Sequence, residues 1–276
     1  VFDQALKNRS SITFTNTNVL RKGNSRNANV SSLNLSLFDK KNTYNYTFTG
    51  SYSSIWGKLG NENGFTTMAG FSKVSGMIQY RGGVSVESDK YNPNDLGFLF
   101  FNNSFEYYGN INYIINKPTR HFLNHNYKVS FNNTYLYKPF VWSEFNTNAS
   151  AFFLFKNFWD ISFSFKSNPF WTKDYFVQSD FYTGYFLRRS PYYYFEVSGS
   201  SDSRKKLYVN WELGGAESPL PNDPLWTGEL GVRYRFNNRF QVSTNLNIEQ
   251  DKGNWGYAFK LNPDGSPVIS RRNVKT

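Results

Sequence analysis

Two histidines, His121 and His125, are the residues whose spacing first suggests chemistry. Four residues apart, they would share one face of a helix and could bind a metal ion together. The sequence has no cysteine, and no acidic cluster completes a ligand set. Both histidines also lie in or beside a predicted connection between strands. We therefore expect a polar turn residue and a strand end here, with no metal ion, no cofactor and no catalytic role.

Three further stretches contain residue types found in ligand sites. The acidic, Asn-rich segment 89–95 could offer oxygen ligands to calcium, but it lacks the ordered spacing of a calcium loop, so we expect an outer loop with turn chemistry. The pairs Gly82-Gly83 and Gly214-Gly215 resemble phosphate loops only superficially, because neither opens a predicted helix. We expect strand glycines that provide bulges, bends or room beside aromatic neighbours. No nucleophile and base can be paired, so enzymatic activity is not expected.

Aromatic residues make up 20% of the chain, although its mean hydropathy is polar at −0.60. Most tryptophans fall near predicted strand ends, as in the aromatic girdle of a membrane barrel. They are Trp56, Trp142, Trp159, Trp171, Trp211, Trp226 and Trp255. A second interpretation is that aromatic residues of one long loop stack on a sugar ligand. These candidate ligand-binding residues are Phe170, Trp171, Tyr175 and Phe176.

Alternating apolar and polar residues predict the elements that carry these side chains. From 240 to 249, the even positions are apolar or Thr and the odd positions are polar or charged. Such alternation indicates half-buried β-strands. The pattern recurs at 33–37, 44–52, 78–86, 105–115, 127–137, 149–155, 159–165, 207–213 and 230–236.

Charged residues within these predicted strands occupy the polar parity. A Lys or Arg that faces the bilayer midplane costs about 2–4 kcal/mol, so this distribution suits a membrane barrel. A soluble sandwich would also keep charges off its inner face, so the distribution alone does not separate the two folds. In a barrel the polar parity would face the lumen. The lumen-facing residues we expect include Arg81, Lys128, Arg233, Arg235 and Glu249.

The predicted connections alternate between short and long. An up-and-down barrel does this when its turns face the periplasm and its loops face outside, whereas a Greek-key sandwich has no reason to. Short links fall at 39–42, 73, 117–122, 157, 202 and 237–238, and longer links at 21–28, 56–64, 88–96, 138–144, 167–190 and 215–225. The expected fold class is therefore all-β, an antiparallel up-and-down transmembrane β-barrel of about fourteen covered strands, as one domain over residues 1–276.

The rest of the composition narrows the alternatives. The formal net charge is +11, but Lys and Arg are scattered and most sit near connections, so we expect no nucleic-acid partner. The sequence contains no run of about 18 apolar residues, so it predicts no transmembrane helix. The chain begins at Val1 without a charged-then-apolar leader, and we expect a signal peptide to be absent, removed or outside the sequence.

The middle of the chain resembles a known family. The residues that carry the resemblance are Tyr91-Asn92-Pro93-Asn94-Asp95-Leu96-Gly97-Phe98-Leu99 with Asn102-Asn103, then 203–207, 235–240 and 271–276. They are similar to a family of uncharacterised outer-membrane proteins of the Bacteroidetes group. The resemblance implies a carbohydrate-binding-like N-terminal domain joined to a large C-terminal barrel, and it supplies no catalytic residues. We therefore expect this chain to be an incomplete part of a bigger barrel.

These expectations combine into a structural or transport barrel, or an accessory subunit of a cell-envelope assembly, located in the cell outer membrane. The expected partners are outer-membrane lipid and lipopolysaccharide, with other envelope subunits and a glycan as further candidates. The first alternative is a porin-like channel with a basic lumen. The second is a soluble extracellular all-β binding protein, and an outer-membrane hydrolase comes last.

Overall fold

The computed structural model describes residues 1–276 except 24, 59, 177–183, 219–224, 262, 264–266 and 276, and for 253–261 and 267–275 it describes the backbone alone. The chain divides into two compact units, each treated by itself below. The first unit comprises Val1–Asn110, Asn132–Glu144 and Lys173–Leu187. The second unit comprises Ile111–Phe131, Phe145–Thr172 and Arg188–Thr276.

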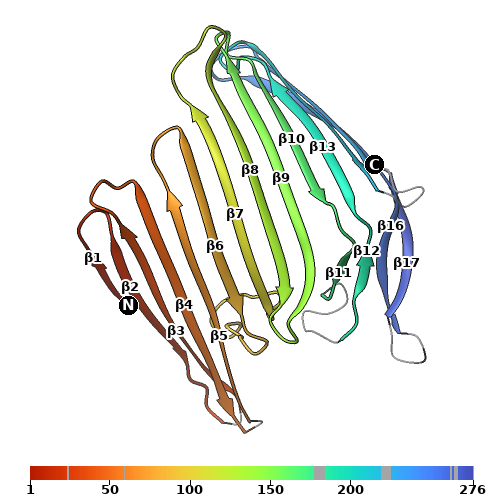
Figure 1. Cartoon of the computed structure of the whole chain (residues 1–276). Helices are drawn as coiled ribbons and strands as arrows, with labels where there is room; N and C mark the ends of the chain where they lie inside the picture. The colour runs from red at the N-terminus through yellow and green to blue at the C-terminus, as the bar shows by residue number, and fades with distance from the viewer. Residues whose placement is uncertain are drawn as a thin grey trace. The chain divides into compact units, whose positions relative to one another are not determined.

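Every regular element of the described residues is a β-strand, which confirms the all-β expectation. Fifteen strands form one sheet whose order follows the chain, and β11 and β12 pair separately (Figure 1). The first strands are β1 (Phe2–Ala5), β2 (Ser11–Val19), β3 (Asn27–Phe38), β4 (Tyr44–Gly57), β5 (Gly60–Lys73), β6 (Ile78–Glu87), β7 (Ser104–Ile115), β8 (Phe122–Leu136) and β9 (Val141–Phe155). The rest are β10 (Asp160–Asn168), β11 (Thr172–Asp174), β12 (Leu187–Arg189), β13 (Tyr192–Ser200), β14 (Leu207–Glu217), β15 (Leu225–Arg235), β16 (Gln241–Leu261) and β17 (Pro267–Lys275).

The sheet is antiparallel and open. Strand β1 pairs with β2, and β17 pairs with β16. In the part of the chain that the structure describes, β1 and β17 are the two edge strands and do not pair with each other. The sheet is therefore not closed into a barrel. The part of the chain that the structure describes contains no helix of the length and apolarity needed to span a membrane.

Two of the expected long links are mostly strand. Strands β4 and β5 continue to Gly57 and Gly60, which pair with each other, and only 137–140 separates β8 from β9. The Gly- and Asn-rich stretch 60–64 does not alternate, which explains the shorter prediction. It is a strand because the backbone ladder with β4 continues beyond the apolar residues, and backbone groups pair whatever their side chains are.

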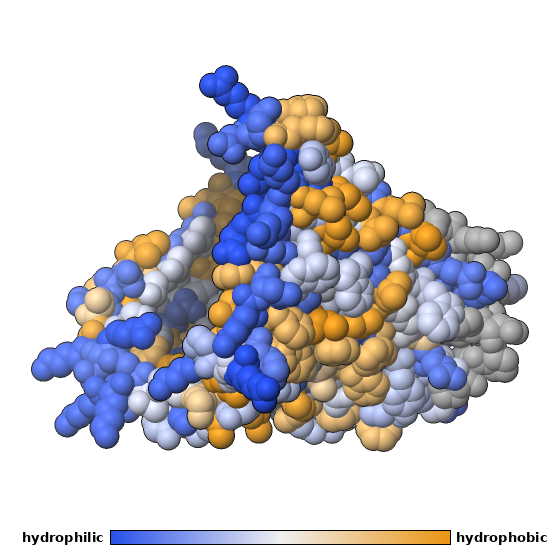
Figure 2. Space-filling view, turned by 90° about the horizontal axis from the view of Figure 1, so that it is seen from above, coloured by the Kyte–Doolittle hydropathy of each residue, from blue (hydrophilic) through white to orange (hydrophobic). Residues whose placement is uncertain are grey.

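Among the described residues, the buried hydrophobic side chains are few and all belong to the first unit. They are Ala28, Ile55, Tyr91, Leu136, Tyr175 and Leu187. The described side chains of the second unit contribute no hydrophobic residue to the buried set. Figure 2 accordingly shows hydrophobic side chains gathered in patches on the molecular surface. A layered domain buries its apolar faces between its layers, whereas the described residues of this chain bury only these six hydrophobic side chains.

Candidate functional site

The second unit has one apolar and one polar face. The register between β14 and β15 places Val209 opposite Val232, and Trp211 opposite Leu230. Leu230 in turn pairs with Leu246 of β16. Leu230 is 46% exposed, although it lies on the middle strand of these three paired strands. This exposed apolar face extends across the strands because successive side chains of a strand point to opposite faces.

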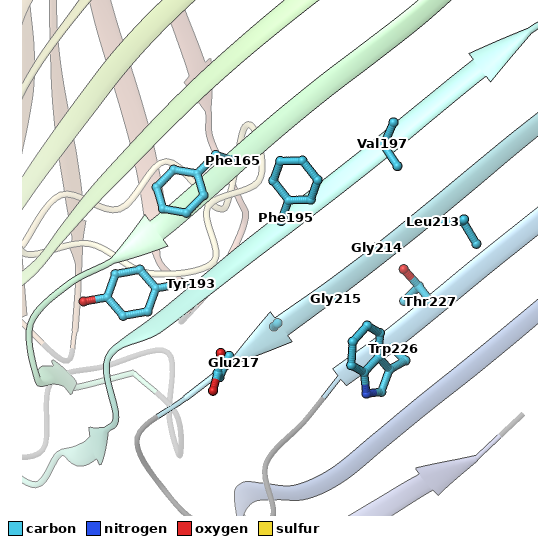
Figure 3. Close-up of a pocket in the computed structure, with 11 residues that line it drawn as sticks. Phe165, Tyr193, Phe195, Val197, Leu213, Gly214, Gly215, Glu217, Trp226 and Thr227 are labelled. Carbon is cyan, nitrogen blue, oxygen red and sulfur yellow. The ribbon is translucent and has the colours of Figure 1, made fainter.

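A shallow groove interrupts this apolar face near one end of β13, β14 and β15 (Figure 3). Its volume is about 740 Å³, and Phe195 and Trp226 are among its lining residues. Gly215 pairs with both of these aromatic residues and leaves the space between them unfilled. A Cβ atom on Gly215 would come 3.1 Å from the Trp226 ring. The groove therefore results from one small residue between two large ones.

The polar face of the second unit has charges on four adjacent strands. The Lys166 ammonium lies 3.7 Å from the Glu196 carboxylate, and Tyr194 donates a hydrogen bond to the same carboxylate over 3.1 Å. Glu212 and Glu229 are direct cross-strand partners. Like charges directly opposite each other destabilise a sheet, so this arrangement is tolerable only beside water or a cation. Among the described residues, no group of three or more His, Cys, Asp or Glu side chains could hold a metal ion.

The expected lumen-facing residues follow the polar parity of their strands. Arg81 donates a hydrogen bond to the Tyr108 hydroxyl over 3.3 Å and lies over its ring. Arg233 donates to the Ser203 carbonyl over 2.7 Å. Lys128 is exposed between the apolar residues of β8, and Arg235 and Glu249 pair across the sheet with Gln241 and Thr227. Acidic residues share this face with the cations, so the polar face of the second unit is mixed in charge.

The first unit carries a loop, 88–103, that folds against the polar face of the sheet. Ser53 of β4 and Gly64 of β5 are register partners on this polar face. The neighbouring pair, Tyr52 and Phe65, is exposed on the other face of the sheet. Ser53 is only 1% exposed, and its hydroxyl accepts a hydrogen bond from the Asn92 amide over 3.0 Å. A Cβ atom on Gly64 would collide with the loop backbone at 90–91. The loop therefore contacts the sheet through its main chain.

Two asparagines fix the returning end of this loop. The Asn102 amide donates to the carbonyl groups of Asp89 and Tyr91, over 3.0 and 2.9 Å. Asn103 exchanges two hydrogen bonds with the backbone of Lys138, over 2.7 and 2.8 Å. Asn103 has a φ of 66°, a conformation that Asn tolerates better than most residues. Where the chain leaves the sheet, these two buried side-chain amides thus provide the hydrogen bonds that the backbone would otherwise receive from a neighbouring strand.

An ion-pair cluster holds the middle of the loop. The Asp95 carboxylate lies 2.7 Å from Arg21 and 2.9 Å from Arg26, both in the link between β2 and β3. The Asp95 side chain is 7% exposed. Asp95 belongs to segment 89–95, which offered oxygen ligands for calcium, but its carboxylate forms ion pairs with two guanidinium groups. The segment is thus the loop that its turn chemistry predicted, and it is fastened to a neighbouring link.

The anchored loop presents exposed aromatic rings. Phe98 and Phe100 are 76% and 66% exposed and contact each other edge to face at 4.5 Å. Phe101, half exposed, stacks on Phe176 at 4.9 Å. Rings held in place by a rigid base can stack on the apolar face of a sugar at little entropic cost. This loop is therefore the candidate ligand platform of the first unit.

The four aromatic residues expected to bind a sugar have separate neighbours. Phe170 packs near Phe145 at 6.0 Å, and Trp171 lies under the Arg188 guanidinium at 4.4 Å, both in the second unit. In the first unit, Tyr175 is buried and contacts Phe186, while Phe176 stacks on Phe101. Phe176 is thus the one that joins the loop platform. The other three remain predictions for a ligand role.

The remaining sequence candidates have structural explanations. His121 lies in the link before β8, while His125 stacks on Phe153 on the apolar face; along a strand the two are about 13 Å apart. The glycine pairs provide room for aromatic residues, as expected. A Cβ atom on Gly83 would lie 2.6 Å from the Tyr108 hydroxyl, and one on Gly214 would collide with the Tyr194 hydroxyl.

The family described as Domain of unknown function (DUF5916) matches residues 1–276. The chain belongs to this family. No curated protein and no solved structure matches it.

In this DUF5916 chain, sequence reasoning missed Phe98, Phe100 and Phe101. Their positions do not alternate, and a sequence cannot show that the loop is held in place. The signal in the sequence is the run 91–99, because the family resemblance rests on it and it lies in this loop. The polar-face acids were also missed, since Glu196, Glu212 and Glu229 adjoin one another only through strand pairing.

Proposed function

We propose that this chain is part of the wall of an outer-membrane β-barrel, acting in transport or as a structural or accessory subunit of a cell-envelope assembly. In this role the apolar face contacts lipid and the polar face borders a water-filled interior. The anchored loop 88–103 lies on the polar side of its own unit and supplies a ligand platform there. This assignment gives each face of the sheet an environment that matches its residues.

The observation that carries the proposal is the apolar face of the second unit. Its strands expose large apolar residues in register, and none of its described hydrophobic side chains is buried. Exposed apolar patches beyond a few hundred Å² mark interaction or membrane surfaces. Strands such as β8 and β9, with 15 residues each, exceed the roughly 9–11 residues that cross a bilayer.

The open edges place a condition on this role. In lipid, the unpaired backbone groups of β1 and β17 would each cost several kcal/mol, so open sheet edges do not occur in the hydrocarbon region. Membrane insertion therefore requires strand partners for both edges, from further strands of the same protein or from another subunit. A barrel larger than fifteen strands follows from the first possibility.

A porin-like channel is the second candidate function. The charged polar face favours it, because charged side chains on adjacent strands need water on that side. Conductance across planar bilayers tests this candidate. Anion-over-cation selectivity would support the basic lumen, and an absence of conductance would favour the structural or accessory role.

The wall proposal is tested by the behaviour of the full-length protein. We expect it to fractionate with outer membranes, to require detergent for extraction, and to enter phosphatidylcholine vesicles as a protease-resistant species. A monodisperse, folded protein in buffer without detergent would contradict the proposal and favour a soluble binding protein. Binding of soluble oligosaccharides to the extracted protein, compared with a Phe98→Ala/Phe100→Ala variant, tests the platform separately.

A further inference from the structure

The positive charge of the second unit is concentrated in the four turns at one end of its strands. The turns are 116–121, 156–159, 201–206 and 236–240, and in Figure 1 they lie together at the top. They contain seven cationic side chains and one acidic side chain, a net charge of +6, which exceeds half of the +11 of the whole chain. The cations are Lys117, Arg120, Lys156, Arg204, Lys205, Lys206 and Arg239, here called the basic rim.

Backbone contacts show that these turns are neighbours. The Lys156 amide donates to the His121 carbonyl over 3.2 Å, which joins the first two turns. The Arg235 amide donates to the Lys206 carbonyl over 2.8 Å, which joins the last two. Asp160, the first residue of β10, pairs with Ser200, the last residue of β13. This pairing places the second turn, 156–159, next to the third, 201–206. The basic rim is therefore one surface and not a set of scattered charges.

Within the basic rim, only Arg204 is neutralised. Its guanidinium donates two hydrogen bonds of 2.8 Å to the Asp202 carboxylate and lies 3.3 Å from the centre of the Phe158 ring. Lys156 and Lys205 are exposed and, like Lys206, have no carboxylate within ion-pair distance among the described residues. These three ammonium groups are therefore available to an external anion.

A groove connects the basic rim with the apolar face. It has a volume of about 540 Å³ and is lined by Lys205 and the Arg204–Asp202 ion pair at the rim, and by Trp159, Leu207 and Val209 toward the apolar face. Lys156 and Lys206 are the sequence neighbours of its lining residues Asn157 and Lys205. Trp159 is 51% exposed and Leu207 is 52% exposed. A ligand in this groove meets the unpaired Lys205 ammonium beside the Arg204–Asp202 pair at one end, and exposed apolar side chains at the other.

We propose that the basic rim binds an anionic phospholipid, with its phosphate among Lys156, Lys205 and Lys206 and an acyl chain along Trp159, Leu207 and Val209. Nucleic acid and soluble anions match the charge but not the apolar half of the groove. Each Lys or Arg close to an anionic bilayer surface strengthens binding by about tenfold or less, and the effect weakens over a Debye length. This inference rests on the proposed membrane location.

The test compares two charge-matched variants of the full-length protein. In the rim variant, Lys156→Gln, Lys205→Gln and Lys206→Gln remove three rim cations. In the control variant, Lys22→Gln, Lys58→Gln and Lys252→Gln remove three exposed cations that are not part of the basic rim. Retention of phosphatidylglycerol and of phosphatidylcholine is measured by native mass spectrometry from a neutral detergent.

We expect the unmodified protein to retain phosphatidylglycerol at least tenfold more tightly than phosphatidylcholine, and 0.5 M salt to reduce this preference. The rim variant should lose the preference by a factor on the order of 10 to 100, and the control variant should keep it. Equal retention of both lipids, an equal loss in the control variant, or tighter binding of duplex DNA than of phosphatidylglycerol would each overturn the inference. If the protein nevertheless enters phosphatidylcholine vesicles, the proposed wall function stands; failure to enter any vesicle would overturn both.

Discussion

Gly64 lies directly beneath the backbone of Tyr91, and the absence of a side chain is what lets the two segments touch. A Cβ atom on Gly64 would collide with the amide nitrogen of Tyr91 and with the carbonyl group before it. Tyr91 is buried at this crossing, and burial raises the pKa of its phenol. At this crossing the backbone of the loop 88–103 packs directly on β5 of the sheet.

Gly64→Ala is therefore expected to loosen the loop. The added methyl group meets main chain that cannot rotate away, so the free energy of opening the loop should fall by about 1–3 kcal/mol. Hydrogen exchange of the amides at 91–99 measures this change. Gly82→Ala is the control, because its Cβ atom has nothing closer than 3.6 Å and should leave exchange unchanged. Wild-type protection in Gly64→Ala would show that the loop does not rest on β5.

Asp95→Asn should also loosen the loop, by removing the charge that two arginines share. Arg21 and Arg26 are each more than a third exposed, so water screens the pairs and the expected loss is about 1–2 kcal/mol. Asp89→Asn is the matched control, since its partner Lys138 is 3.8 Å away and well exposed, and its effect should stay within about 0.5 kcal/mol. Equal exchange rates in the two variants would contradict the role of Asp95.

The turn at 201–206 should respond to acid only at low pH. The hydrogen bonds from Arg204 lower the pKa of Asp202 to about 2. A carboxylate with a lowered pKa stabilises the fold above its unfolded pKa, so this contribution is complete above about pH 4 and is lost as the pH falls toward 2. Carboxyl ¹³C NMR should show this titration, shifted upward by Arg204→Gln and barely moved by Lys205→Gln. A wild-type pKa at its ordinary value would mean that the pair does not form.

Placing a charge on the apolar face should cost far more than placing it on the polar face. Leu246→Arg puts a guanidinium opposite Leu230, whereas Asn247→Arg puts one opposite Glu229 on the next residue of the same strand. In neutral-lipid vesicles we expect a loss of about 2–4 kcal/mol for the first and little change for the second. Urea unfolding from the vesicles gives both values. A similar loss in both variants would argue against a lipid-facing surface.

The sequence predicts this fold well where side chains alternate. Residues 207–213, 230–235 and 241–248 are strands in the structure, because period-two patterning reflects the faces of a sheet directly. It fails at 60–64, where the backbone ladder and not side-chain burial maintains the strand. The expected girdle also has an exception, since Trp211 lies inside β14 and not near its end.

The candidate sites were less predictable because they depend on contacts between distant residues. The sequence predicts a link at 88–96, whereas the loop extends to 103. Its attachment through Ser53, Gly64 and Arg21 joins segments that are tens of residues apart. The sequence places most Lys and Arg near connections, but it does not show the basic rim as one surface, because its cations are distributed over four turns that become neighbours only when the strands pair. Among the aromatic residues expected to stack on a ligand, Tyr175 is buried, which its loop position did not indicate.

The most direct measurement of the central claim is spin-label accessibility along β15. The chain has no cysteine, so single cysteines can be introduced without a background signal. After reconstitution in neutral vesicles, labels on the apolar face should be accessible to oxygen, which concentrates in lipid, and labels on the polar face to a water-soluble nickel chelate. The apolar positions are Leu230, Val232 and Tyr234, and the polar positions are Thr227, Glu229 and Arg233. We predict strict alternation of the two accessibilities with residue number; nickel access at all six positions, or oxygen access at none, would contradict the account.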